Sequence, residues 1–181
     1  MGAEAEGPKA PGASPLGRLT IALSRPFARR GIYLGRRSTR IHVAIYRATG
    51  GRLGGRAPGW PEARIALVHH RGRRTGTARV SPLVYLEDGA NLAVVASKAG
   101  QPSDPAWLHN LRAHPEIEVE IGRQRRPVRA RVADPDERDR LWPRFDAAYP
   151  EYPIYRERAA PREIAIVILE PRPGDPAGGA R

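Results

Sequence analysis

Cysteine is absent from the 181-residue sequence, and lysine occurs only at Lys9 and Lys98. Without thiols the chain forms no disulfide, no thiolate metal site and no cysteine nucleophile, which fits a reducing compartment. No stretch approaches the roughly 20 apolar residues that span a bilayer, and the N-terminal residues lack the basic-then-apolar order of a secretory signal. We therefore expect a cytoplasmic protein.

Positive charge is abundant instead. The formal net charge is +12, which attracts phosphates, polyanionic ligands or anionic lipid head groups, although a codon bias toward arginine would produce the same excess. A local cluster is more informative than the total. In "RGRRTGTARVSPL" (71–83), four arginines surround a Thr-Gly-Thr turn, and arginines beside Gly and Thr in a turn are suited to binding oxyanions.

The length fits one globular domain with two unstructured ends. Residues 1–15 and 172–181 are rich in Gly, Ala and Pro, and we expect both to be disordered. Residues 16–40 are expected to form a basic amphipathic helical segment, because apolar side chains recur at helical spacing, namely Leu16, Leu19, Leu23 and Phe27. This segment either packs on the domain or contacts anionic lipid at the inner face of the membrane through residues 16–37.

Residues 41–171 contain several strand patterns. The runs 41–47 and 64–70 are β-branched and apolar, and 78–86 and 91–97 flank an Asp88-Gly89 turn typical of a hairpin. In "EIEVEIG" and "PVRARV" apolar residues alternate with glutamates and with arginines respectively, which predicts a second hairpin with one wet face per strand and cross-strand ion pairs. The run "REIAIVILEP" is apolar on both faces and predicts a central strand.

Two helices interrupt these strands. The first is expected to begin with Asp104 as N-cap and Pro105 at the first helical position. The second begins at Asp134, with Glu137 completing a capping box and Pro143 kinking the helix; its expected buried residues are Leu141, Trp142, Phe145 and Ala148. Antiparallel strands with few helices favour an α+β domain of the β-barrel type.

Several other motifs carry no site. "GGRLGG" (50–55) lacks the following helix that a dinucleotide fingerprint requires. His69 and His70 are adjacent on a strand and point to opposite faces, so they do not chelate one metal together, and we expect no metal. Around the basic turn, Arg74, Arg79 and Lys98 could surround one phosphate, with the Thr75 hydroxyl and the Gly76 amide as neutral donors. Trp107 could wall an aromatic ring, and three tyrosines line a pocket or close a small core: Tyr149, Tyr152 and Tyr155.

These motifs occur in a specific order. "GRRTG", "PL", "DG", "ASK", "PAW", "NL", "YPEY" and "LEP", spread between about Tyr46 and Pro171, resemble the deazaflavin (F420)-dependent nitroreductase family of actinobacteria, to which F420H2-dependent quinone reductases belong. The resemblance implies a six-stranded, mostly antiparallel split β-barrel of the FMN-binding-like type, with flanking helices. It also implies coenzyme F420 as cofactor and an oxidoreductase activity.

Site residues follow from the resemblance, position by position. The cofactor phosphate is expected among Arg74, Thr75, Gly76, Arg79 and Lys98, and the deazaflavin ring along Pro82, Leu83, Ala96 and Ser97, near Ala99, Trp107 and Asn110. Tyr149, Tyr152 and Tyr155 are expected to face the acceptor. Ala99 stands where the family often has glycine, and His69 and His70 replace hydroxyl residues, so the substrate preference depends on whether an imidazole reaches the pocket.

The resulting hypothesis is hydride transfer to a quinone, a nitro compound or an enone, with Tyr149 or Tyr152 hydrogen-bonding the acceptor oxygen. An FMN-binding split-barrel oxidase or reductase would use the same basic cradle. A basic nucleic-acid-binding barrel is the second alternative, with an affinity that falls steeply with salt; we do not expect it. The sequence leaves open the natural acceptor and whether the chain is a monomer or a homodimer.

Overall fold

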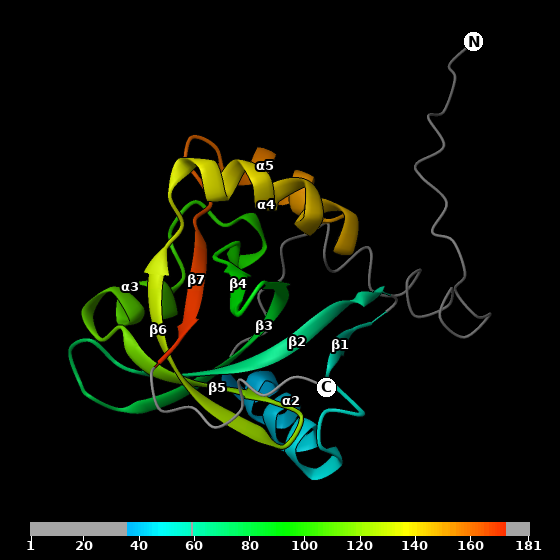
Figure 1. Ribbon diagram of the computed structural model, residues 1–181, viewed down its shortest axis with the longest axis vertical. Coiled ribbons are helices and arrows are strands. Elements are labelled where there is room, and N and C mark those ends of the chain that lie inside the picture. Colours follow the sequence, from blue (N-terminus) through cyan, green and yellow to red (C-terminus); the bar gives the residue numbers. More distant parts are fainter. Residues whose placement is uncertain (1–35, 59, 173–181) are drawn as a thin grey trace.

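The computed structural model describes residues 36–58 and 60–172. The predicted tails and most of the predicted basic segment 16–40 lie outside the described residues, so the predictions made for them stay predictions. The described chain begins with a helix and continues as a barrel of strands with further helices around it (Figure 1).

Helix α2 (Arg36–Thr49) replaces the strand predicted at 41–47, so that prediction is wrong. Ile41 and Ile45, four residues apart, share the exposed face of the helix, while Tyr46 is buried. The run is rich in β-branched residues, but a short apolar run does not by itself distinguish a strand from a helix. The Tyr46 hydroxyl accepts a hydrogen bond from Gly122 N and donates one to Ile65 O, and these two bonds hold α2 on the barrel.

The strands form one sheet in which every pairing is antiparallel. They are β1 (Arg56–Ala57), β2 (Trp60–Arg71), β3 (Ala78–Asp88), β4 (Asn91–Val95), β5 (Glu116–Ile121), β6 (Gln124–Val132) and β7 (Ile166–Pro171). Their order is β1-β2-β3-β4-β7-β6-β5, and β2 pairs with β5 as well, which closes the six strands from β2 to β7 into a barrel. The predicted six-stranded split β-barrel is confirmed.

Both predicted hairpins are present. Asp88 lies opposite Asn91 across the first turn, and Ile121 lies opposite Gln124 across the second. In the second hairpin the cross-strand ion pairs are made by Arg125, which precedes the predicted strand "PVRARV", with Glu118 and Glu120. Arg131, one of the arginines of that strand, pairs instead with Glu137 and Glu170. One glutamate departs from the prediction of a wet face, because Glu120 is only 6% exposed. The cause is α2, which covers that part of β5 and contributes Arg47 to Glu120.

The other helices are α3 (Ala106–Ala113), α4 (Pro135–Ala148) and α5 (Tyr152–Ala159), with a short 3-10 helix η1 at Lys98–Gly100. The capping box of α4 is confirmed, since the side chains of Asp134 and Glu137 each accept the other's backbone N–H. Pro105, not the predicted Asp104, caps α3. Helix α5 was not predicted, because eight residues are too few to display a helical period.

Two apolar clusters stabilise this arrangement. The first fills the barrel and receives residues from all six barrel strands and from α3, including Val68, Trp107 and Leu169. The second lies between the barrel and helices α4 and α5, and includes Phe145, Tyr152 and Ile168. Strand β7 supplies alternate residues to both clusters, which confirms its predicted central position. Trp142, predicted to be buried, is only partly buried and packs against the second cluster.

Candidate functional site

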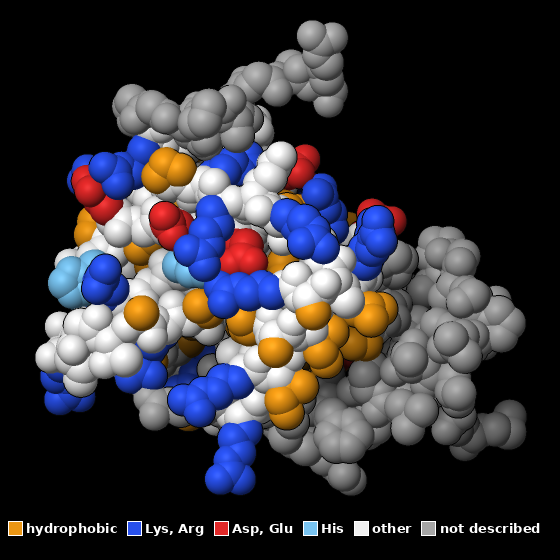
Figure 2. Space-filling model, turned by 90° about the horizontal axis from the view of Figure 1, so that it is seen from below, with side chains coloured by type: hydrophobic (Ala, Val, Ile, Leu, Met, Phe, Trp, Pro, Cys, Tyr) orange, Lys and Arg blue, Asp and Glu red, His pale blue; other side chains and the backbone are white. Residues whose placement is uncertain are grey.

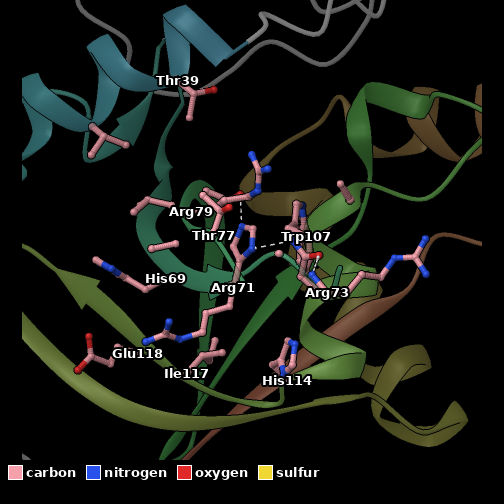
Figure 3. Close-up of a pocket in the computed structure, with 18 of the residues that line it drawn as sticks. Thr39, His69, Arg71, Arg73, Thr77, Arg79, Trp107, His114, Ile117 and Glu118 are labelled. Atoms are coloured by element: carbon pink, nitrogen blue, oxygen red, sulfur yellow. Dashed lines mark hydrogen bonds between the residues drawn. The ribbon is translucent and has the colours of Figure 1, made fainter. Parts of the chain in front are cut away.

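A cavity of about 1520 Å³ lies where β2 ends and β3 begins. Figure 3 shows its surroundings, with Thr39 on α2, Arg73 and Arg79 near the β2–β3 turn, and Trp107 on α3. The cavity is lined by Thr39, Arg40, Val43, Ala44, Arg47, His69, His70, Arg71, Gly72, Arg73, Arg74, Thr75, Thr77, Ala78, Arg79, Val80, Ser81, Ala106, Trp107, His109, Asn110, His114, Glu116, Ile117, Glu118, Arg125, Pro127 and Arg172.

Positive charge dominates this lining, which contains eight arginines but two glutamates. Each guanidinium group also offers several N–H donors in a planar arrangement. Figure 2 looks onto the face that carries α2 and shows basic side chains predominating over acidic ones. The cavity therefore suits an extended anionic ligand with more than one negative group.

The turn of residues 72–77 is held by its own backbone. Gly76 N and Thr75 N both donate to Gly72 O, at 2.7 and 3.2 Å, and Gly72 N donates to Thr77 O at 2.9 Å. The Gly76 amide, which the sequence suggested as a donor to an anion, is thus engaged inside the turn. Its fixed shape leaves the arginine side chains and the Thr75 hydroxyl as the groups that can reach a ligand.

Helix α3 anchors the same turn. Arg73 N donates to Asn110 Oδ1 at 2.9 Å, and the amide group of Asn110 also contacts His70 Nδ1 at 2.9 Å. His70 is buried and its other ring nitrogen lies 3.0 Å from Ser81 Oγ. Burial, together with the positive charges of Arg79 and His69, lowers the pKa of His70 to about 4. The imidazole is therefore neutral at physiological pH.

Beside the cavity, the Glu120 carboxylate contacts three basic side chains. It lies 2.9 Å from Arg47 Nη2 and 2.9 Å from His69 Nε2, and 3.5 Å from Arg125 Nε. Burial alone would raise the pKa of Glu120, but the hydrogen bonds from Arg47 and His69 outweigh it and lower that pKa. Burial lowers the pKa of His69, partly offset by Glu120. This cluster attaches α2 to the barrel beside the cavity.

The segment 96–101 lies outside the cavity lining and is shaped by Arg162. The Arg162 guanidinium donates to Ala96 O, Ser97 O and Gln101 O, and it pairs with Asp104 at 3.2 Å. Lys98 Nζ donates to Ser103 Oγ at 2.8 Å. Lys98 and Ala99 adopt φ values of 48° and 52°, a left-handed conformation in which a glycine would be less strained.

The predicted tyrosines gather elsewhere, on and beside α5. Tyr152 and Tyr155 are buried in the second apolar cluster, and Tyr149 is partly buried against it. The Tyr149 and Tyr155 hydroxyl oxygens lie 3.5 Å apart, and Trp60 meets Tyr149 edge-on with ring centroids 6.3 Å apart. Burial raises the pKa of all three tyrosines, which keeps them protonated.

The structure thus divides the predicted site residues into groups. Five predicted cofactor contacts line the cavity described above: Arg74, Thr75, Arg79, Trp107 and Asn110. Gly76 belongs to the turn, and Pro82 and Leu83 continue β3 directly beyond Ser81, which lines the cavity. Ala96 is buried in the barrel, and Ser97, Lys98 and Ala99 lie beside α5, with Arg158 Nη1 donating to Ala99 O at 3.2 Å.

Sequence reasoning missed three features: the polar chain from Asn110 through His70 to Ser81, the guanidinium of Arg162, and the attachment of α2 through Glu120. Each depends on side chains that converge from separate elements. The adjacent pair at 69 and 70 was the one available signal, since polar side chains on both faces of an otherwise apolar strand require partners.

Comparison with known proteins agrees with this geometry. Residues 38–171 match the family model described as F420H(2)-dependent quinone reductase. The chain is 38% identical, over 143 residues, to an F420H(2)-dependent quinone reductase of Mycobacterium tuberculosis strain H37Rv; the match covers 77% of this chain and 94% of that protein.

Two solved structures are similar to this chain. A structure described as an F420-H2 dependent reductase, FDR-A, is 34% identical, with a TM-score of 0.54, covering 59% of this chain and 93% of that one. A second, described as a domain-swapped dimer, is 30% identical with a TM-score of 0.57, covering 74% and 96%. The chain therefore belongs to the F420H(2)-dependent quinone reductase family, and it is an oxidoreductase that uses reduced coenzyme F420 as hydride donor.

Proposed function

We propose that the arginine-lined cavity binds the anionic tail of coenzyme F420 and that the enzyme reduces a quinone held on the side of Tyr149. The observation that carries this proposal is the lining itself, with eight arginines against two glutamates around the 72–77 turn. The phosphate is assigned to Arg74, Thr75 and Arg79. The more distant Arg40, Arg47 and Arg125 would follow the carboxylate groups of the tail.

The donor set fits this cofactor. A phosphodiester extended by glutamates carries several negative charges in a row, and guanidinium groups bind both phosphate and carboxylate through paired N–H donors. The cavity of about 1520 Å³ has room for such a tail in addition to a single phosphate. Lys98, whose ammonium donates to Ser103 within the loop, would need to exchange that bond to reach the phosphate.

The ring is assigned to the surface formed by Pro82, Leu83 and Ser97, beside the buried Ala96. Pro82 and Leu83 are partly exposed on β3, and the carbonyls of Ala96 and Ser97 are fixed by Arg162. Trp107, on the cavity side, provides a flat apolar wall. When bound, reduced F420 supplies a hydride to the acceptor.

The chain's own residues hold the reactants and stabilise developing charge. A quinone that gains a hydride becomes anionic on one oxygen before it takes up a proton. Of the three tyrosines, Tyr149 is the more accessible, and its hydroxyl is protonated and oriented by Tyr155. We assign Tyr149 as the donor to that oxygen, with Tyr155 supporting it and Tyr152 packing behind both.

Titration of the purified protein with oxidised F420, followed by fluorescence or calorimetry, tests the assignment. Arg79→Ala and Arg74→Ala should each weaken binding about tenfold or more, because each removes a charge-assisted contact. Arg52→Ala is the matched control, since Arg52 is exposed and does not line the cavity. Equal affinities of all three variants for F420 would contradict the proposal that the F420 tail binds in this cavity.

The same titration separates the alternatives. Flavin mononucleotide and single-stranded DNA serve as competing ligands, and selective binding of either one would replace the assignment to F420. Turnover assays with a quinone, a nitro compound and an enone define the acceptor class. Saturable turnover with the quinone is expected.

Contact with anionic lipid is a further part of the proposal, with the cytoplasm as compartment. Among the described residues no helix is long and apolar enough to cross a membrane. Ile41 and Leu53 are nevertheless 62% and 61% exposed, next to the exposed Arg40 and Arg52, which favours surface contact continuous with residues 16–37. Sedimentation with vesicles of anionic lipid should carry the protein down, and Ile41→Glu should reduce that fraction. Equal recovery with neutral vesicles would contradict it.

A further inference from the structure

His70 lies at the centre of a polar chain that joins three elements of the cavity wall. The residue is 6% exposed, and both of its ring nitrogens have partners: Asn110 Nδ2 on α3 lies 2.9 Å from Nδ1, and Ser81 Oγ on β3 lies 3.0 Å from Nε2. The dashed lines in Figure 3 mark hydrogen bonds of this pocket. His70, Ser81 and Asn110 all line the cavity assigned above to the cofactor.

The direction of every hydrogen bond in this chain follows from one fixed donor. Arg73 N is a backbone amide and can only donate, so the atom of Asn110 that faces it is the carbonyl oxygen. The NH2 group of Asn110 then faces His70 and donates to Nδ1. Because Nδ1 accepts, the proton of the neutral ring is on Nε2. Nε2–H therefore donates to Ser81 Oγ.

These hydrogen-bond directions determine whether the Ser81 hydroxyl can donate to a ligand. A hydroxyl that already accepts a hydrogen bond still has its own hydrogen to donate. Among the described residues, the Ser81 side chain forms its hydrogen bond with His70. Ser81 is partly exposed and lines the cavity. Its hydrogen is thus free to point to a ligand.

We propose that His70 is a positioning residue that turns the Ser81 hydroxyl into a donor for an acceptor oxygen of the bound cofactor, such as a carbonyl or phosphate oxygen. The inference rests on the proposed function for its ligand and on the hydrogen-bond directions for its geometry. It makes residue 81 a determinant of specificity, because the site then favours an acceptor over an N–H group at this place. The neutral state of His70 described above agrees with it.

The first test needs no cofactor. Nitrogen-15 NMR of histidine-labelled, ligand-free protein distinguishes the two neutral tautomers, and the His70 signals are assigned by their loss in His70→Gln. A protonated Nε2 with an unprotonated Nδ1 is expected at neutral pH. Asn110→Asp removes the donor to Nδ1 and should change that pattern. A protonated Nδ1 in the unmodified protein would overturn the proposal.

The second test is a double-mutant cycle on the affinity for oxidised F420. Ser81→Ala should weaken binding about tenfold, as expected for one hydrogen bond to a ligand oxygen. His70→Gln should weaken it by a similar factor, and the double variant should lose no more than the larger single loss, because both changes remove the same contact. Factors that multiply in the double variant would overturn the proposal.

Controls separate this inference from the proposed function. His42→Gln alters a histidine of α2 whose Nε2 lies 2.7 Å from Gly54 O and which does not line the cavity, so it should leave the affinity unchanged. Thermal unfolding checks that each variant is folded. If wild-type protein binds F420 and Ser81→Ala binds it equally well, the inference fails while the proposed function stands. If the wild type does not bind F420, both fail.

Discussion

The Arg47 guanidinium and the Glu120 carboxylate lie 2.9 Å apart and join α2 to β5. Glu120 is buried and also binds His69 and Arg125. Replacing it with glutamine leaves three basic groups without their anion. We expect Glu120→Gln to lower the free energy of unfolding by about 2 kcal/mol, measured by urea denaturation.

Glu87→Gln is the matched control for charge, because it removes a carboxylate from an ion pair whose members, Arg64 and Glu87, are both well exposed. Its effect should remain within about 0.5 kcal/mol. Equal losses in the two variants would show that Glu120 does not hold α2 in place.

Gly100 provides a second test of stability, because its surroundings differ sharply from those of Gly89. Both have positive φ, 74° and 62°. A Cβ on Gly100 would lie 2.9 Å from the backbone oxygen of Tyr155, whereas a Cβ on Gly89 would meet nothing within 4 Å. Gly89→Ala should cost about 1 kcal/mol from backbone strain alone. Gly100→Ala should cost about 2 kcal/mol more.

Calorimetric unfolding of the two alanine variants measures this difference. The Gly100 variant should also perturb the tyrosine fluorescence, because the η1 segment lies against Tyr155. Similar melting temperatures would indicate that η1 and α5 separate without cost.

Stability should fall as the pH is lowered through the range in which His70 titrates. Its pKa is about 4 in the folded protein, below the ordinary value of 6.5, because of burial and the nearby charges of Arg79 and His69. Between these values the unfolded chain binds a proton that the folded chain does not, so the stabilisation present above pH 6.5 is lost toward pH 4. The loss should reach about 3 kcal/mol.

Denaturation at several pH values, with His70→Gln as comparison, checks the assignment. The variant should show a flatter profile between pH 6.5 and 4.5. Asp88 and Glu137 do not account for a loss of stability in this range, because neighbouring arginines hold their pKa values at about 2. Their contributions to stability are lost only as the pH falls below the ordinary pKa values of these carboxyl groups. Parallel profiles would assign the acid sensitivity to other groups.

Tyr149→Phe should lower the turnover number for a quinone at least tenfold, about the smallest effect expected from losing a donor to an anionic oxygen, and should leave the affinity for F420 nearly unchanged. Tyr152→Phe should have the smaller effect on turnover, because its ring is enclosed by Phe145, Tyr149 and Tyr155. Steady-state kinetics together with the binding titration measure both quantities. Unchanged turnover in both variants would exclude these hydroxyls from the mechanism.

Much of the fold was predictable from local patterns. The Asp88-Gly89 turn, the alternation in 116–132 and the capping box of Asp134 and Glu137 are signals contained within short segments, and all three are confirmed. Helix α2 was not predicted, because the run 41–47 is rich in β-branched residues, which are typical of strands. That single error also explains why Glu120 was assigned to solvent.

The candidate site was predictable only in part. A cluster of arginines in one turn can be recognised from the sequence alone, and five of the predicted cofactor contacts line one cavity. The chain through His70 requires Ser81 and Asn110 from different elements, and no spacing along the sequence encodes that convergence. The roles assigned to the individual cofactor and acceptor contacts stay predictions that the experiments above decide.

The pairing of β2 with β5 has one more consequence. Where a strand of the ring has a neighbour on each side, as residues 67–69 of β2 have in β3 and β5, its backbone donors and acceptors are used within the ring. Among the described strands, backbone edges stay open where a strand pairs on one side alone, as in residues 78–83 of β3 and residues 124–126 of β6. Copies of this protein that associate through backbone pairing would have to meet at such an edge.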